Sequence, residues 1–148
     1  MSWSDRFGFG LMSGLIAGFA VLGIGGRIAM RLVSIAEGQP PRFTARGTFG
    51  VLLVFSIIGI ILSVPFATFQ TYLGSSNLRK GATFGLLLML VIVWVMPLLP
   101  LLAGDRADEL SFASIVARML FSALFVGYGV TVASVSDRLY KVEASRRT

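Results

Sequence analysis

The chain has 148 residues, of which 55% are hydrophobic and only 14% charged, a composition that excludes an ordinary soluble surface. Its formal net charge is +6, but the basic residues fall at the ends of long apolar segments, where they meet lipid phosphates rather than nucleic acid. Cysteine and histidine are both absent, so disulfides, Ser–His and Cys–His catalysis, and metal or haem sites built on those ligands are excluded, and no cofactor is expected.

Four stretches without a charged residue dominate the chain, and each is about as long as a bilayer is thick. They are Phe7–Gly26, Gly47–Leu78, Gly81–Gly104 and Met119–Ser136. A helix needs roughly 20 apolar residues to cross about 30 Å of hydrocarbon. These stretches lack the alternation of barrel strands, and lipid allows only helices or closed barrels to span it. The sequence therefore predicts an all-α, four-transmembrane-helix bundle in a single membrane domain.

The boundaries of the expected helices follow from charges, prolines and glycines. The helices are expected at residues 7–36, 44–73, 82–103 and 111–135, followed by a charged tail at 137–148. Because proline denies a helix its donor, the prolines after Glu37 are expected to stop the first helix. Pro65 is a candidate kink in the second helix. Residues 74–77, Gly-Ser-Ser-Asn, are expected to form a tight polar turn.

Small residues recur four apart on three of the expected helices. The stripes are Gly10, Gly14 and Gly18 on the first helix, Gly81 and Gly85 on the third, and Ala123, Gly127 and Thr131 on the fourth. Small residues at this spacing let helix backbones approach closely in lipid. The fourth helix is the expected partner of the first. If these faces instead stay exposed on the monomer, a homo-oligomer or a larger membrane complex is implied.

Arginines in or beside the apolar segments are the candidate residues for binding an anion or a lipid headgroup. Arg118 lies inside the fourth expected helix, and Arg27 and Arg31 lie one turn apart at the end of the first. Together they would hold a phosphate or another anion through bidentate contacts. The alternative is that they snorkel to the interface or pair with acids in nearby loops, namely Glu37, Asp105, Asp108 and Glu109. No Asp or Glu lies in the four apolar cores, which counts against a proton-coupled carrier.

Two stretches carry a resemblance to known families. Gly26–Arg31, a Gly-Arg-x-Ala-Met-Arg stretch, and Gly127-Tyr128-Gly129 before a basic tail resemble uncharacterised bacterial four-helix membrane proteins, a likeness that covers the whole chain and implies the architecture alone. Gly23–Arg31 is also similar to the glycine–arginine stretch in the first helix of crevice-forming fluoride channels. The second-helix asparagine of those channels is missing here. Small multidrug resistance transporters are similar in size, but their membrane glutamate has no counterpart.

The sequence predicts a non-enzymatic, multi-pass integral membrane protein with a structural or accessory role in a membrane assembly. The alternative is a small anion channel, or an anion- or lipid-binding transporter, that uses the arginine cluster. Membrane lipids are the expected partners, with a homo-oligomer or a larger membrane complex, and nucleic acid is not. Four spans place both termini on one side, and that side carries more Lys and Arg than the other, so an inner membrane location with cytoplasmic termini is expected.

Overall fold

The computed structural model describes residues 3–39, 44–69, 76–95 and 112–146, and all regular structure in these ranges is helical. The elements in chain order are α1 (Trp3–Ala17), η1 (Gly18–Gly25), α2 (Gly26–Ala36), α3 (Ala45–Phe69), α4 (Asn77–Met89), η2 (Leu90–Val95) and α6 (Phe112–Arg146). The segments η1 and η2 are π-helical; η1 joins α1 to α2 without a break, and η2 extends α4. The predicted all-α class is confirmed.

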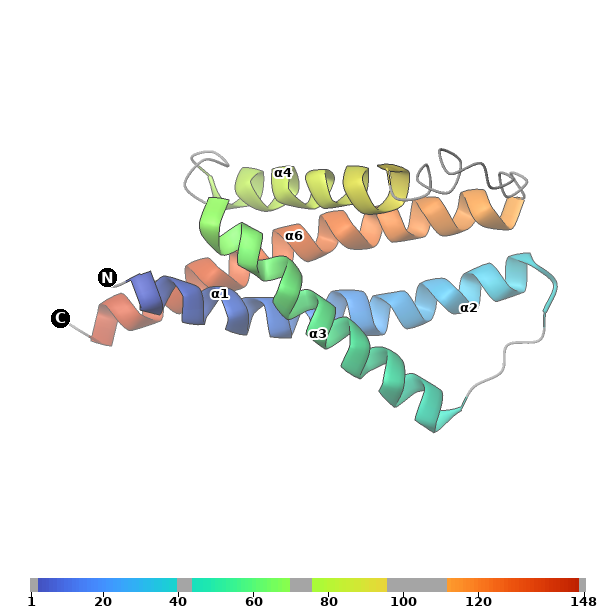
Figure 1. Cartoon of the computed structure of the whole chain (residues 1–148), viewed down its shortest axis with the longest axis horizontal. Helices are drawn as coiled ribbons and strands as arrows, with labels where there is room; N and C mark the ends of the chain where they lie inside the picture. Colours follow the sequence, from blue (N-terminus) through green and yellow to red (C-terminus); the bar gives the residue numbers. More distant parts are fainter. Residues whose placement is uncertain (1–2, 40–43, 70–75, 96–111, 147–148) are drawn as a thin grey trace.

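Three helices are long and apolar enough to cross a membrane, and they correspond to the first, second and fourth expected spans. They are Gly8–Ala36, Ala45–Phe69 and Ser114–Glu143. The elements form four helical rods, namely α1–η1–α2, α3, α4–η2 and α6. These rods run in alternating directions, so both termini lie at the left end of Figure 1. In the same view α3 crosses α1 obliquely, and its first turns diverge from α2.

The first rod ends through a glycine rather than through proline alone. Gly38 adopts a left-handed conformation with φ +70°. Its amide donates to the Ile35 carbonyl, and the Gln39 amide donates to the Ser34 carbonyl, both at 3.0 Å. This pair of bonds is the Schellman arrangement, which satisfies carbonyls that the helix end leaves without partners. Pro40 and Pro41 lie outside the described residues.

Hydroxyl caps begin α3 and α4, and one of them corrects the sequence analysis. The Thr44 hydroxyl accepts from the Gly47 amide at 3.3 Å, so α3 begins at Ala45. The Ser76 hydroxyl likewise accepts from the Arg79 amide at 3.4 Å. Asn77 is therefore the first residue of α4 and not part of a turn, and α4 begins before the expected residue 82. Residues 96–103 of that expected helix lie outside the described residues.

The fourth rod is longer than expected. The sequence predicts an end at residue 135, but α6 continues to Arg146. Asp137 and Lys141 pair at 2.8 Å across one turn, an arrangement that supports a helix. Ser136, one residue earlier, is buried against the rest of the molecule. The charged tail therefore belongs largely to the helix.

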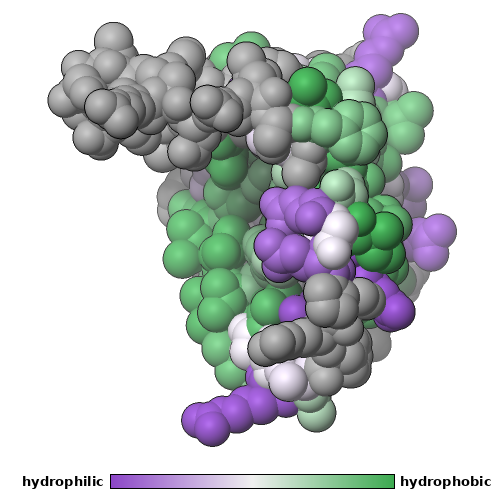
Figure 2. Space-filling model, turned by 90° about the vertical axis from the view of Figure 1, so that its right-hand side faces the viewer, coloured by the Kyte–Doolittle hydropathy of each residue, from purple (hydrophilic) through white to green (hydrophobic). Residues whose placement is uncertain are grey.

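The core consists of two closely packed helix pairs, α1–η1 with α3 and α4 with α6, joined by contacts of α1, η1 and α2 with α6. Its buried members are mostly large apolar side chains, namely Ala17, Leu22, Phe66, Phe84, Phe125, Tyr128, Val132 and Ala133. The rings of Phe66 and Phe84 lie 5.1 Å apart between their centroids and connect the two pairs. Figure 2, which views the end opposite the termini, shows hydrophobic side chains over much of the described perimeter and a hydrophilic group near the middle. This outer surface suits contact with lipid tails.

Candidate functional site

The small-residue stripe of the first rod packs against α3. A Cβ atom added at Gly10 would lie 2.8 Å from the Ala67 Cβ, and one added at Gly18 would lie 2.8 Å from the Gly59 Cα. Gly14 sits between them, against Ser63 and the Gly59 carbonyl. The expectation that the fourth helix covers this stripe is therefore wrong. Helix α3 has its own small residues four apart, namely Gly59, Ser63 and Ala67. Two faces of small residues allow the backbones of the two helices to come into contact.

The glycines of α4 pack against α6 in the same manner. A Cβ at Gly81 would lie 2.6 Å from the Val130 Cα, and one at Gly85 would lie 2.7 Å from the Val126 Cα. On α6 the close contact is made by Gly129, whose added Cβ would meet Gly85 at 2.7 Å from its Cα. Gly127, the glycine singled out in the sequence, has only the Val21 side chain nearby, at an ordinary 3.5 Å. Gly129 was missed because it lies off the four-residue spacing.

Two buried side-chain hydrogen bonds fasten α6 to the first two rods. The Tyr128 hydroxyl, on a fully buried side chain, donates to the Gly59 carbonyl at 2.5 Å. The Ser136 hydroxyl donates to the Ser13 hydroxyl at 2.8 Å, and Ser13 donates in turn to the Gly10 carbonyl at 2.8 Å. Among the described residues, every buried side-chain nitrogen or oxygen has a hydrogen-bond partner. An apolar surrounding requires this, since an unsatisfied polar group there is costly.

The three predicted arginines lie in different surroundings. Arg27 is half-buried, and its Nε donates to the Thr48 hydroxyl at 3.2 Å, which ties α2 to the start of α3. Arg31 is exposed. Arg118 is half-buried on α6. Of the acids considered as partners of these arginines, Glu37 is exposed, and Asp105, Asp108 and Glu109 lie outside the described residues.

An apolar groove of about 400 Å³ lies beside Arg118, between α3, η2 and α6. Its lining residues, hereafter the Arg118 groove, are Phe55, Ile58, Ile92, Ala117, Arg118, Phe121 and Phe125. Arg118 is the one charged residue in this lining, and neither Arg27 nor Arg31 takes part in it. The described surfaces thus do not bring the three arginines to a common cavity.

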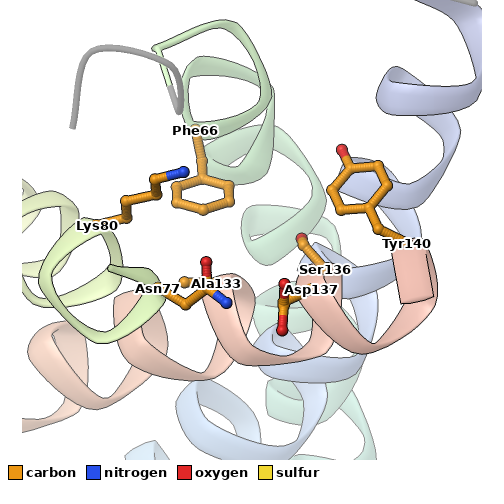
Figure 3. A pocket seen from close by; sticks show the side chains of 7 residues that line it. All are labelled: Phe66, Asn77, Lys80, Ala133, Ser136, Asp137 and Tyr140. Atoms are coloured by element: carbon orange, nitrogen blue, oxygen red, sulfur yellow. The ribbon is translucent and has the colours of Figure 1, made fainter. Parts of the chain in front are cut away.

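A second, smaller and more polar pocket of about 120 Å³ lies toward the termini, and sequence reasoning did not anticipate it. This termini pocket is lined by Phe66 of α3, Asn77 and Lys80 of α4, and Ala133, Ser136, Asp137 and Tyr140 of α6 (Figure 3). In that view Lys80 and Tyr140 lie on opposite sides, with Phe66 between them. The sequence signal for this pocket was the pair of charges at the start of α4, Arg79 and Lys80. Asp137 was not expected near them, because the fourth helix was expected to end at residue 135.

The polar groups of the termini pocket are partly engaged with one another. The Asp137 carboxylate pairs with Lys141 at 2.8 Å and also accepts a hydrogen bond from the Asn77 side chain. Tyr140 packs edge-on against Phe9 of α1, with ring centroids 5.4 Å apart. Lys80 is half-buried, and within the described residues its ammonium group has no ion-pair partner.

Comparisons with protein-family models, with curated proteins and with solved structures found no match to this chain. The resemblances to bacterial four-helix membrane proteins and to fluoride channels therefore stay predictions.

Proposed function

We propose that this chain is a four-span, non-enzymatic integral membrane protein with a structural or accessory role in a membrane assembly. Three of the spans are supported by length and composition. The fourth would include the rod formed by α4 and η2, which lies alongside α6 (Figure 1). In the sequence this rod is followed by the apolar residues 96–103. Alternating rods of this kind return the chain to its starting side.

The observation that carries the proposed role is the closure of the small-residue faces within the chain. Gly10, Gly14 and Gly18 are covered by α3, and Gly81 and Gly85 by α6. Backbone contact of this closeness leaves no space for a water-filled path between the paired helices. The described interior instead holds hydrogen-bonded serines and Tyr128. A packed core with a lipid-facing apolar exterior favours a structural role over conduction.

An experiment with purified protein in liposomes separates this role from the anion channel. We expect no flux of fluoride, chloride or phosphate above that of protein-free vesicles, measured with ion-selective electrodes or a potential-sensitive dye. A photo-crosslinking residue at Ile61, an exposed position on α3, is expected to trap a discrete protein partner in native membranes. The same probe at buried Val132 is the matched control and should trap none. Flux that Arg118→Leu abolishes would contradict the proposed role.

The Arg118 groove favours a second candidate function, the binding of an anionic amphiphile. Its lining is aromatic and aliphatic, and a guanidinium group lies at one part of it. A lipid or fatty-acid chain would fill the apolar part while its acidic group contacts Arg118. A spin-labelled fatty acid should then bind the unmodified protein, and Arg118→Leu should weaken its binding. Equal binding by the two proteins would dismiss this candidate.

A further inference from the structure

We propose that the termini pocket binds the phosphate group of a membrane phospholipid. The proposal rests on the proposed function in one respect, namely that this end of the bundle lies at the membrane interface. The pocket is formed by three separate helices, and its polar lining residues come from α4 and α6. Its location is distinct from the Arg118 groove, with which it shares no lining residue.

The charged side chains in and next to the pocket leave an excess of one positive charge. The two charged residues that line the pocket, Lys80 and Asp137, have opposite charges. Lys141 pairs with Asp137 from outside the lining and brings the balance of these three side chains to +2 − 1 = +1. Asp137 is already neutralised by Lys141 at 2.8 Å. Lys80, which lines the pocket, also acts on the Asp137 carboxylate through its charge, so the two lysines share one acid. A phosphodiester carries a single negative charge at neutral pH and would complete the balance.

The size and lining of the pocket restrict what enters it. At about 120 Å³ the pocket has less than a third of the volume of the Arg118 groove, about 400 Å³, so it suits a phosphate group better than an acyl chain. Lys80 and Asn77 offer N–H groups at the α4 side, while Ser136 is occupied by its bond to Ser13. Phe66 and Ala133 form an apolar wall. The glycerol and acyl chains of a bound lipid would therefore extend outward along the helices.

The residues around the pocket fit an interfacial location. Arg79 and Arg138, which follow or precede lining residues in the sequence, are exposed, and Lys141 is exposed one turn after Asp137 on α6. Basic residues at a helix end attract the phosphates of the lipid surface. Tyr140, an aromatic residue with a polar tip, is of the type enriched at this depth. A lipid headgroup is thus the source of phosphate closest to the site.

The test compares ligands and charge variants in detergent solution. Phosphatidylglycerol, diacylglycerol and inorganic phosphate are titrated separately into the purified protein, and the melting temperature is recorded. We expect phosphatidylglycerol alone to raise it saturably. Lys80→Gln should raise the half-saturating lipid concentration roughly tenfold or more, because it removes a charge-assisted contact. Arg79→Gln, the adjacent exposed residue with the same charge change, is the matched control and should leave it unchanged.

A variant with the opposite sign keeps the test decisive even if Lys80→Gln does not fold. Asp137→Asn raises the balance of the pocket to +2 and should lower the half-saturating lipid concentration. An equal effect of diacylglycerol, or an equal loss in Arg79→Gln, would overturn the phosphate site. A Lys80-dependent effect of inorganic phosphate at the same concentrations would overturn the lipid as its source. A protein that inserts without conducting but ignores all three ligands refutes this inference alone, whereas anion flux refutes only the proposed function.

Discussion

One hydroxyl group joins the two helix pairs at the centre of the molecule. Tyr128 belongs to α6 and reaches the Gly59 carbonyl of α3, although these helices otherwise touch little. Gly59 has no side chain, and that leaves its carbonyl accessible to the tyrosine. Gly59 also packs directly against the backbone of the first rod. A Cβ atom added to Gly59 would lie only 2.6 Å from the Gly14 carbonyl oxygen and would also collide with the backbone of Gly18. Gly59 thus takes part in two inter-helix contacts, and the spacing of small residues considered in the sequence analysis did not include it.

Tyr128→Phe is expected to lower stability while preserving the fold. The change keeps the buried ring and removes only the inter-helix hydrogen bond, which in membrane proteins is worth about 0.6–1.7 kcal/mol. We expect a fall of a few degrees in the melting temperature in detergent. Thr131→Val is the matched control, since Thr131 donates only to the Gly127 carbonyl of its own helix at 2.8 Å. Equal losses in the two variants would show that the inter-helix bond is not special.

At the scale of the helices, each close pair consists of two antiparallel rods that follow each other in the chain and that both carry a face of small residues. The first rod and α3 follow each other in the chain and carry complementary faces, Gly10, Gly14 and Gly18 opposite Gly59, Ser63 and Ala67. The α4 and α6 pair is built similarly around Gly81, Gly85 and Gly129. Each stripe identified in the first and third expected helices does meet another helix closely. Predicting that the first rod packs against α3 would have required the small residues of α3 to be considered as well.

Two glycine substitutions should differ in their effects on stability. Gly14→Leu places a side chain where an added Cβ already lies 2.7 Å from the Gly59 carbonyl, so α1 and α3 must separate. Overpacking of this kind costs about 1–3 kcal/mol or more, and thermal unfolding should occur at lower temperature. Gly50→Leu, on the exposed side of α3 with nothing within 4 Å of its added Cβ, should be neutral or stabilising. A Gly14→Leu protein as stable as the parent would show that this face is not a packing surface.

At the scale of the whole molecule, the alternating rods predict where each end of the bundle lies. The chain contains no cysteine, so single-cysteine variants give unambiguous labels. Ser145→Cys, near the C-terminus, should react with an impermeant maleimide only from the cytoplasmic side. Gln39→Cys, after α2 and equally exposed, should react only from the opposite side. Labelling of both positions from one side would contradict the four-span arrangement, and labelling of each from both sides would indicate dual insertion.

The sequence was sufficient for the helical class because long apolar runs have few alternatives in lipid. The sequence was less informative about where the helices end. Charges at Arg79, Lys80 and Asp137 suggested positions outside the helices, but these residues lie within α4 and α6. Ser76 caps the start of α4, and Lys141 pairs with Asp137 within α6. The termini pocket was not predictable because it depends on three helices meeting at one place. The Arg118 groove was anticipated only through its arginine, and its apolar walls come from distant positions.

The lengths of the helices have a consequence for the bilayer itself. The three candidate spans contain 29, 25 and 30 residues. At a rise of about 1.5 Å per residue they are about 44, 38 and 45 Å long, whereas typical hydrocarbon is about 30 Å thick. The charge-free parts of these helices, residues 8–26, 47–69 and 119–136, are only about 28, 34 and 27 Å long, close to the thickness of the hydrocarbon. The charged ends of the helices should therefore extend past the hydrocarbon into the headgroup layer. The α3 side, which has the longest apolar stretch, should need the most tilting of its helix or thickening of the lipid beside it.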